Sequence, residues 1–333
     1  MKNHPYAGTL PENILLEILK QNQRHWISGQ AIARRLSLTR CAVWKKMAAL
    51  KADGYDIESS PRKGYRLMEA PDRMLAGEIR HLLHTTVLGQ HEIYCHKVTD
   101  STNIRAKALA AAGAAEGVLV VAEEQAQGRG RLDRPWFSSA GENICASLII
   151  RPPLPPSEAS RMSILAAVAA AEAIIEVTGL PAKIKWPNDI IIGSRKIGGI
   201  LLEMAVEMDA VDYMIIGLGL NVNTPGECFP AEIRDRATSV FRETGRPFPR
   251  IKLLRRFLEL LESNYDLIRR NGFAPVLARW KDLTEILGRR VSVGTINGNY
   301  SGTATDLDAD GFLILRNDHG GEIRLFSGDI TIL

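Results

Sequence analysis

The chain has 333 residues, of which 45% are hydrophobic and 24% charged, and its formal net charge is +4. This composition is typical of a soluble globular protein of about two or three domains, and it excludes disordered, collagen-like and disulfide-scaffold proteins. Four widely spaced cysteines without a C-x-x-C pair predict reduced thiols. Because the chain has neither a signal-peptide pattern nor an apolar run of roughly 20 residues, we expect a cytoplasmic protein with no membrane partner.

Positive charge is concentrated at the N-terminal end. Residues 1–68 contain 12 Lys and Arg against five Asp and Glu, a local charge of +7, so the remaining residues together carry −3. A basic module on a mildly acidic body is typical of a nucleic-acid-binding head. A solvated basic surface without a partner is the alternative, and the local pattern has to decide between them.

The spacing of apolar residues in this module predicts a helix-turn-helix. One helix follows Pro11 to about residue 20, a second is capped by Ser28 and runs to residue 36, and a third is capped by Thr39 and runs to about residue 52. The last two are joined by a tight turn at residues 37–38. In the third helix Val43 and Met47 are expected to point inward, which leaves basic side chains on the outer side.

A β-hairpin is predicted directly after these helices, with strands at 55–58 and 65–67 and a turn at 59–64. Such a wing can reach a phosphate backbone. We therefore predict a winged helix-turn-helix DNA-binding domain over residues 1–69. The residues expected at the DNA are Ser28, Gly29, Thr39, Arg40, Trp44, Lys45, Lys46, Arg62 and Lys63.

Strands and helices alternate beyond a linker predicted at 70–72. Helical periodicity is found at 159–177 and 251–270. The β-rich stretches are 118–122, 144–150, 184–186, 190–192, 197–204 and 213–219. Because several strands follow one another over short turns, we expect an α+β domain around a mixed sheet, over residues 74–284.

The C-terminal segment has a different pattern. Four short β stretches, at 290–293, 302–306, 312–315 and 322–326, are separated by Asn-Gly, Asp-Gly and Gly-Gly pairs. This spacing predicts a small β-barrel over residues 286–333. The full expectation is an α+β multidomain protein.

A glycine- and arginine-rich loop follows the predicted strand 118–122. Gly128, Arg129, Gly130 and Arg131 combine a pliant backbone with permanent charges, so the loop can fold over a phosphate or carboxylate. The pattern is not a P-loop, because no G-x-x-x-x-G-K-[ST] occurs. A basic surface turn is the alternative for this loop taken alone.

Two further stretches carry polar residues at strand ends. In the first, Lys185 and Lys196 flank a Pro-Asn-Asp turn and a hairpin, and a lysine beside small residues can neutralise an oxyanion. In the second, residues 217–223, a buried strand ends in Asn221. The alternatives are an ordinary hairpin with solvent-facing lysines and a plain polar strand end.

Other candidate sites have less support. Ser101, Thr102 and Asn103 can be read as a simple N-cap of a helix that starts near residue 104. His81 and His84 match no usual zinc spacing. The chain has no G-x-S-x-G, Cys/His or H-E-x-x-H pattern, so hydrolysis by a side-chain nucleophile is not expected.

Taken together, the motifs of the central domain resemble those of the biotin protein ligases. The motifs, in chain order, are Asp100–Asn103, Gln125–Arg131 with Trp136 downstream, Lys185–Asp189, Lys196–Leu201 and Gly217–Asn221. With the winged head and the barrel, the chain is most similar to bifunctional members, which are both biotin–[acetyl-CoA-carboxylase] ligases and biotin operon repressors. The resemblance implies a class II aminoacyl-tRNA-synthetase-like central domain and an SH3-like C-terminal β-barrel.

The resemblance also implies roles for individual residues. The implied catalytic cations are Lys196, Arg131 and Lys185. The implied ATP and magnesium contacts are Asn188, Asp189 and Asn221. The residues implied to bind biotin and its adenylate are Ser101, Thr102, Asn103, Gln125, Arg129, Gly130, Arg131, Trp136, Lys196, Gly199 and Asn221. The family often has another basic residue and a glycine where this chain has Leu132 and Asp133.

Two activities are implied. Biotin, a substrate, would be activated by ATP with Mg²⁺ to biotinyl-5′-AMP, and a lysine of a biotin carboxyl carrier protein, a part of acetyl-CoA carboxylase, would then accept it. No tightly bound prosthetic group and no fixed metal are implied. The adenylate would also promote a homodimer that binds operator DNA.

Three alternatives stay open at this point. A lipoate ligase shares the catalytic architecture. A ligand-sensing repressor could lack turnover, and a ligase could carry a vestigial head.

Overall fold

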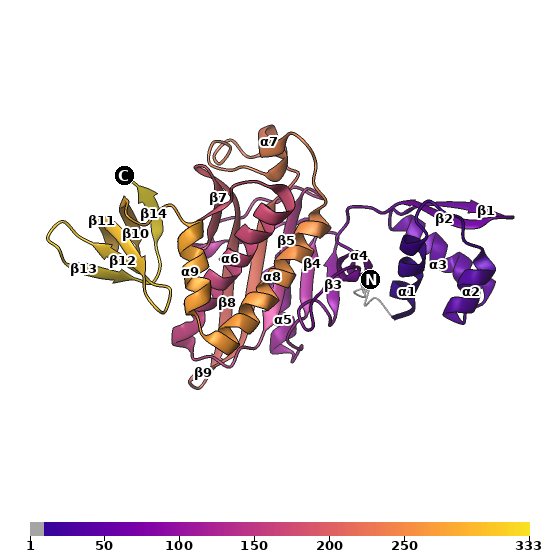
Figure 1. The fold of residues 1–333 in the computed structure, drawn as a ribbon, viewed down its shortest axis with the longest axis horizontal. Helices are drawn as coiled ribbons and strands as arrows, with labels where there is room; N and C mark the ends of the chain where they lie inside the picture. The colour runs from indigo at the N-terminus through magenta and orange to yellow at the C-terminus, as the bar shows by residue number, and fades with distance from the viewer. Residues whose placement is uncertain (1–9) are drawn as a thin grey trace. The chain divides into compact units, whose positions relative to one another are not determined.

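The computed structural model describes residues 10–333 (Figure 1). The chain divides into two compact units, of which one ends at Leu82 and the other spans Leu83–Leu333. Among the described helices, none is both long and apolar enough to cross a membrane. All four cysteines are free thiols.

The N-terminal unit is a winged helix-turn-helix, as predicted. Its elements are α1 (Leu10–Gln21), α2 (Gly29–Leu36), α3 (Arg40–Ala52), β1 (Asp56–Ser60), β2 (Gly64–Glu69) and α4 (Ala76–Arg80). The Ser28 and Thr39 hydroxyls accept the backbone N–H of Ala31 and Ala42 at 3.1 Å, so both predicted N-caps are confirmed. The core of the unit includes Leu15, Leu19, Ile32, Val43, Met47, Ile57 and Leu67.

This compact unit extends to Leu82, beyond the predicted linker at 70–72. The reason is α4, which packs against α1. Its buried Glu78 accepts hydrogen bonds from Lys20 Nζ at 2.6 Å and from Tyr55 Oη at 2.5 Å. Burial, together with the adjacent Glu78 carboxylate, raises the pKa of Tyr55 above its usual value. A polar network therefore fixes a segment that the sequence pattern assigned to the next domain.

A seven-stranded mixed sheet forms the centre of the second unit. The strands, in the order in which they pair, are β3 (Ile93–His96), β4 (Leu119–Ala122), β5 (Asn143–Ile150), β9 (Ala210–Asn221), β8 (Arg195–Glu207), β7 (Asp189–Ile192) and β6 (Lys183–Lys185). Only the β3–β4 pair among these is parallel. The mixed sheet is confirmed, and β3 is a strand that the sequence pattern missed.

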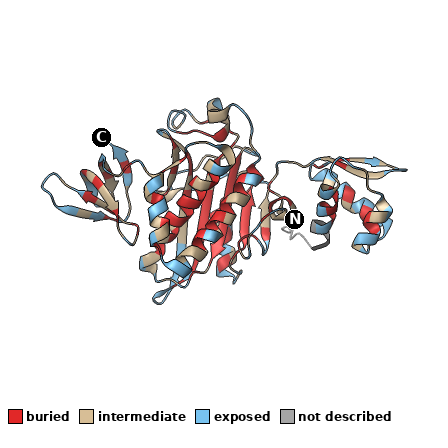
Figure 2. Cartoon of the chain, in the orientation of Figure 1, coloured by how far each residue is buried: buried red, intermediate tan, exposed pale blue. Residues whose placement is uncertain are grey.

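Helices cover this sheet. The helices of the unit are α5 (Thr102–Ala111), α6 (Ala159–Thr178), α7 (Val240–Thr244), α8 (Arg250–Asn271) and α9 (Ala274–Leu283), with short 3₁₀ turns at Arg131–Asp133, Pro156–Glu158 and Gly226–Cys228. Figure 1 shows α6, α8 and α9 over one face. Every residue of β5 is buried, and Figure 2 shows the buried residues gathered on the central strands and on the helices against them.

The α5 face of the sheet carries the polar residues that matter below. Ala106 and Ala110 of α5 pack with Ile149 of β5 and Ile215 of β9. Because side chains alternate along a strand, Ser147 on β5 and the glycines at 217 and 219 on β9 face the same way. The sheet thus offers a small-residue floor next to the start of α5.

The C-terminal segment is a five-stranded antiparallel sheet in the order β13-β12-β11-β10-β14. Its strands are β10 (Arg290–Thr295), β11 (Gly298–Leu307), β12 (Leu313–Arg316), β13 (Glu322–Leu325) and β14 (Asp329–Ile332). Trp186 Nε1 donates to Gly311 O at 3.2 Å, and Ser160 Oγ donates to Asp310 O at 2.5 Å. These bonds attach the sheet to the central domain. The last strand, β14, was not predicted.

We expect Glu78→Ala to destabilise the N-terminal unit by about 3 kcal/mol, because Lys20 and Tyr55 lose the carboxylate that they share in a buried position. Chemical denaturation followed by circular dichroism measures the change. Glu58→Ala is the matched control: its ion pair with Arg66 is partly exposed, so we expect a loss below about 1 kcal/mol. Equal losses in the two variants would contradict the role of Glu78.

Candidate functional site

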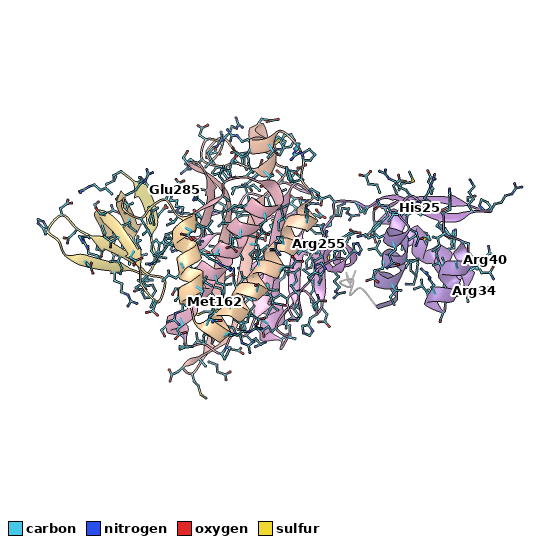
Figure 3. The ribbon with its side chains drawn as sticks, viewed as in Figure 1. His25, Arg34, Arg40, Met162, Arg255 and Glu285 are labelled. Atoms are coloured by element: carbon cyan, nitrogen blue, oxygen red, sulfur yellow. The ribbon has the colours of Figure 1, made fainter. Side chains whose placement is uncertain are left out.

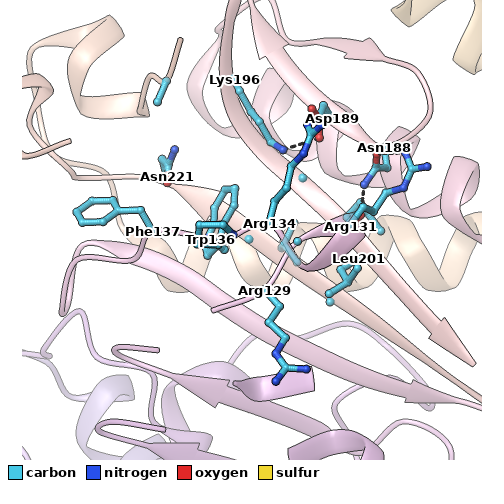
Figure 4. Close-up of a pocket in the computed structure, with 18 of the residues that line it drawn as sticks. Arg129, Arg131, Arg134, Trp136, Phe137, Asn188, Asp189, Lys196, Leu201 and Asn221 are labelled. Atoms are coloured by element: carbon cyan, nitrogen blue, oxygen red, sulfur yellow. Dashed lines mark hydrogen bonds and ion pairs between the residues drawn. The ribbon is translucent and has the colours of Figure 1, made fainter. Parts of the chain in front are cut away.

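A cavity of about 650 Å³ lies in the second unit and is lined by segments that are far apart in the sequence. All the residues that the sequence singled out for the central site line it, namely Ser101, Thr102, Asn103, Gln125, Arg129, Gly130, Arg131, Trp136, Lys185, Asn188, Asp189, Lys196, Gly199 and Asn221. Figure 4 shows several of them around the opening. Their individual roles stay predictions, but they form one site.

The first end of the cavity is polar and carries few charges. Ser101, Thr102 and Asn103, at the start of α5, are all nearly fully buried. Thr102 donates from its backbone N–H and its hydroxyl to Gln125 Oε1, at 2.8 and 3.0 Å. Ser101 occupies the N-cap position, but its side chain makes no capping hydrogen bond. The structure therefore does not support the simple N-cap reading of this motif.

A hydrogen-bonded chain holds Asn103 in place. Ser147 Oγ lies 2.5 Å from Asn103 Oδ1 and 2.7 Å from Thr102 Oγ1, and Asn103 Nδ2 donates to Glu203 Oε2 at 2.8 Å. Buried polar groups whose hydrogen bonds are satisfied are rigid and directional. This end can bind an uncharged polar ring system in one orientation.

Two glycines of β9 make room for this arrangement. A Cβ atom at Gly217 would lie 2.2 Å from Asn103 Oδ1, and one at Gly219 would lie 2.6 Å from Trp136 Cε2. The two positions are two residues apart, so they open the same face of the strand. The Gly-x-Gly pattern here serves close packing and not a dinucleotide turn.

The second end of the cavity gathers cations. Lys196 Nζ lies 2.6 Å from Asp189 Oδ1 and 5.7 Å from the ring centre of Trp136. Arg131 Nη1 donates to Asn188 Oδ1 at 3.2 Å, and Asn188 Nδ2 donates to Ile200 O. In Figure 4, Lys196, Asp189, Asn188 and Arg131 approach one another. Lys196 therefore lines the cavity, while its side chain is 39% exposed.

Arg131 is partly removed from water. Burial lowers the pKa of Arg131, while the nearby Asp189 and Asp329 carboxylates raise it and Arg134 lowers it. A guanidinium stays protonated at neutral pH despite such a shift, so the site keeps a cation whose hydration is incomplete. An incoming anion would compensate for that lost hydration.

The arginine loop folds back on itself. Trp136 N donates to Gly128 O at 2.9 Å, and Gly130 N donates to Arg134 O at 2.7 Å. Leu132 and Asp133 adopt left-handed backbone, with φ of 55° and 54°. Arg129 lines the cavity but points away from the Lys196 group in Figure 4.

The sequence pattern missed a carboxylate that comes from the C-terminal sheet. Asp329, at the start of β14, accepts from Arg134 Nη1 at 2.9 Å and lies 3.7 Å from Lys185 Nζ. Burial alone would raise the pKa of Asp329, but Arg134 and Lys185 hold it below its usual value. The only signal was a short Gly-Asp-Ile-Thr-Ile run at the C-terminal end of the sequence, which does not reveal the distant partners.

A buried ion pair supports the strand end that leads into the arginine loop. Arg250 on α8 is 1% exposed, and its Nη1 donates to Glu123 Oε2 at 2.7 Å and to Asn143 O at 3.2 Å. Asn221 is tied down nearby, because its Nδ2 donates to Thr238 O at 3.0 Å. Neither anchor was predicted, since both depend on tertiary contacts.

The predicted DNA-facing residues lie on the surface of the N-terminal unit. Arg40 and Lys45 of α3 are exposed, as are Arg62 and Lys63 at the wing tip, whereas Lys46 is half-buried. The Ser28 and Thr39 hydroxyls are engaged as helix caps, and Gly29 packs against the Tyr65 ring. Figure 3 shows Arg34, which was not predicted, and Arg40 pointing away from the body of the unit. The exposed face is basic, as a DNA-binding surface requires.

Comparison with known proteins gives three family matches. Residues 95–221 match the biotin/lipoate A/B protein ligase family, residues 12–66 match an HTH domain, and residues 286–332 match the biotin protein ligase C-terminal domain. Together they cover the head, the site and the C-terminal sheet.

Individual relatives agree with these matches. The bifunctional ligase/repressor BirA of Bacillus subtilis is 40% identical over 318 residues, which is 96% of this chain and 97% of that protein. The biotin–[acetyl-CoA-carboxylase] ligase of Paracoccus denitrificans is 34% identical and covers 68% of this chain and 94% of its own length. The structure of biotin protein ligase from Aquifex aeolicus in complex with biotin and ATP matches with a TM-score of 0.62 at 28% identity, over 72% of this chain and 98% of that one.

We expect Gly217→Ala to destabilise the second unit by about 2 kcal/mol, since the added methyl group overlaps the Asn103 side chain. The same substitution in an Asn103→Ala background should cost less than about 0.5 kcal/mol, because the overlap is gone. Urea denaturation of the two single variants and the double variant measures this coupling. Additive costs would show that the close contact does not shape the site.

Proposed function

This chain belongs to the biotin protein ligase family, and we propose that it attaches biotin to a biotin carboxyl carrier protein and also represses a biotin operon. The observation that carries the proposal is the cavity, which joins a hydrogen-bonded polar end to a cationic end. Biotin has the matching chemistry, with an uncharged ring system at one end and a carboxylate at the other. The cytoplasm, which holds both DNA and carboxylase, is the compartment that we propose.

Biotin binding uses the two ends of the cavity differently. Ser101, Thr102 and Asn103 present rigid polar groups to the ureido and thiophene rings. Lys196 and Arg131 then lie where the carboxylate ends, and Trp136 beside Lys196 supplies apolar contact. Charge-assisted bonds to Lys196 and Arg131 would hold the carboxylate for reaction.

In the first step an oxygen of the biotin carboxylate attacks the α-phosphorus of ATP. The bond from this phosphorus to the bridging oxygen breaks, pyrophosphate leaves with the electron pair, and biotinyl-5′-AMP remains. Two anions have to approach each other, so fixed cations do most of the catalytic work. Lys196, Arg131 and Lys185 are the cations that we assign to this step.

In the second step the neutral ε-amine of a lysine on the carrier protein attacks the carbonyl carbon of the mixed anhydride. The bond from this carbon to the phosphate oxygen breaks, AMP leaves, and the new amide loses a proton. Between the steps the arginine loop at 128–136 has to keep water away from the anhydride. Residues 132–135 of this loop are exposed, which is consistent with such a movable cover.

Magnesium would enter with ATP. A Mg²⁺ ion that arrives on nucleotide phosphates needs about one or two protein carboxylates, and Asp189 offers one in the cavity that Asn188 and Asn221 also line. We propose these three residues as the ATP and magnesium contacts. When bound, the ion would offset phosphate charge in the first step.

Repression would follow from the same intermediate. If the adenylate orders the loops around the cavity and favours a homodimer, two winged heads can bind a two-fold operator. The coupling is reciprocal, so operator DNA would also favour the adenylate-bound form. We propose the exposed basic face of α3 and the wing as the surface that binds DNA.

We expect Lys196→Ala to lower the rate of adenylate formation by about 10²–10³-fold, because a fixed cation next to the reacting groups is lost. Pyrophosphate release with biotin, Mg²⁺ and labelled ATP measures it. Lys183→Ala is the matched control, since Lys183 lies on β6, which β7 separates from the strand of Lys196, and it is outside the cavity and donates to Asp282 O. Normal adenylation by Lys196→Ala would remove the main catalytic assignment.

We expect Arg40→Ala or Lys45→Ala to weaken DNA binding while biotin transfer is spared, because both residues are exposed on α3. Each lost phosphate contact should reduce the slope of log affinity against log salt by about one. The probe is a duplex that the wild-type protein selects from a random pool, with biotin, ATP and Mg²⁺ present. Equal loss of DNA binding and transfer would contradict the division of labour between the units.

A further inference from the structure

The outer face of α3 exposes a large aromatic side chain. Trp44 is 61% exposed, whereas its neighbours Val43 and Met47 on the inner face are each 1% exposed and fill the core. The core is therefore complete without the indole. Within the described chain, Trp44 makes no hydrogen bond or ring contact.

The other tryptophan of this unit, Trp26, is covered by neighbouring side chains. Trp26 has Lys63 5.8 Å and Arg66 4.8 Å from its ring centre, so cations of the wing cover it. It is also only half-exposed. Trp26 thus has a structural role in holding the wing, and among the described residues no cation covers the ring of Trp44 in the same way.

The residues around Trp44 favour a polyanion as its occupant. Arg40 lies one turn before it and Lys45 directly after it, and both are exposed. Cys41 and Ala48, three residues before and four after, are exposed and small, so they let the helix approach a surface closely. Residues 1–68 carry a net charge of +7. The helix-turn-helix fold, whose second helix enters the major groove, favours DNA as that polyanion.

The major groove of DNA offers one apolar group on its base edges, the C5-methyl group of thymine, and thymine carries the acceptor O4 next to it. An indole has an apolar surface, one N–H donor and no acceptor. Trp44 lies in the first half of the second helix of the helix-turn-helix, the part that faces base edges in this motif. Among the bases, thymine alone offers both features that an indole can use.

We propose that Trp44 reads thymine methyl groups in the major groove and makes this protein selective for A·T pairs opposite the start of α3. This inference rests on the DNA-binding function proposed above. Arg40 and Lys45 contribute affinity through phosphates, which carry no sequence information. Trp44 contributes selectivity.

The test compares two duplexes of one sequence. The wild-type protein first selects a duplex from a random pool, and the same sequence is then made with deoxyuridine in place of thymidine, which removes only the methyl groups. We expect wild-type binding to the deoxyuridine duplex to be weaker by about fourfold for each contacted methyl group. Trp44→Ala should bind both duplexes with the same reduced affinity, and Trp44→Phe should keep part of the difference.

Lys45→Ala is the matched control on the same helix. It should lose affinity for both duplexes equally and keep the thymine-to-deoxyuridine ratio of the wild-type protein. Equal binding of the two duplexes by the wild-type protein would overturn the assignment while leaving DNA binding intact, and this measurement needs no variant to fold. A Trp44→Ala protein that keeps the wild-type thymine-to-deoxyuridine binding ratio would also overturn the assignment. So would a Trp44→Ala protein in which only self-association changes. If the selection enriches no duplex, both the Trp44 assignment and the proposed DNA-binding function are wrong.

Discussion

Holding two cations close together in a partly dry cavity is the constraint on which the rest of the site depends. Lys196 and Arg131 need neighbours that keep them in place, and Asp189 and Asn188 supply these contacts at 2.6 and 3.2 Å. Both neighbours come from the same short turn and strand, so the hairpin of β7 and β8 carries cation and counterion together. Side chains that line one cavity thus hold both cations, and cations held in this way can stabilise developing charge strongly.

The polar end depends on the backbone more than on the side chains. Gly217 and Gly219 remove two Cβ atoms from one face of β9, and the space is taken by Asn103 and Trp136. Gly128 has the same function in the loop, where a Cβ atom would lie 2.6 Å from Trp136 O. The glycine-rich motifs are thus steric requirements of a tightly packed site.

The sequence predicted the longest elements and singled out residues that line one cavity, and it failed mostly where elements are short or contacts are distant. The strand β5 and the helices α6 and α8 have enough residues to show a clear period. The missed elements β3, α4, α7 and β14 have four or five residues each, too few for a period to be recognised, and the ten-residue helix α9 was missed as well. Asp329 and the Arg250–Glu123 pair were not predicted for another reason. Their residues interact with partners that lie more than a hundred residues away in the sequence. The winged head was recognisable because its caps, turn and charge all lie within one short segment.

Both units use arginine and lysine to bind anions, but these side chains differ in how far they are exposed to solvent. In the head Arg40 and Lys45 stand in water, so they can attract a polyanion over a distance, with an affinity that falls as salt screens it. In the cavity Arg131 has lost part of its hydration, and Lys196 is paired and packed near an aromatic ring. A desolvated, oriented cation selects a small anion by geometry and is screened much less. A single chain can therefore bind a polymer loosely and reversibly at one end and hold a reactive intermediate firmly at the other, with no change in the chemistry of its charged groups.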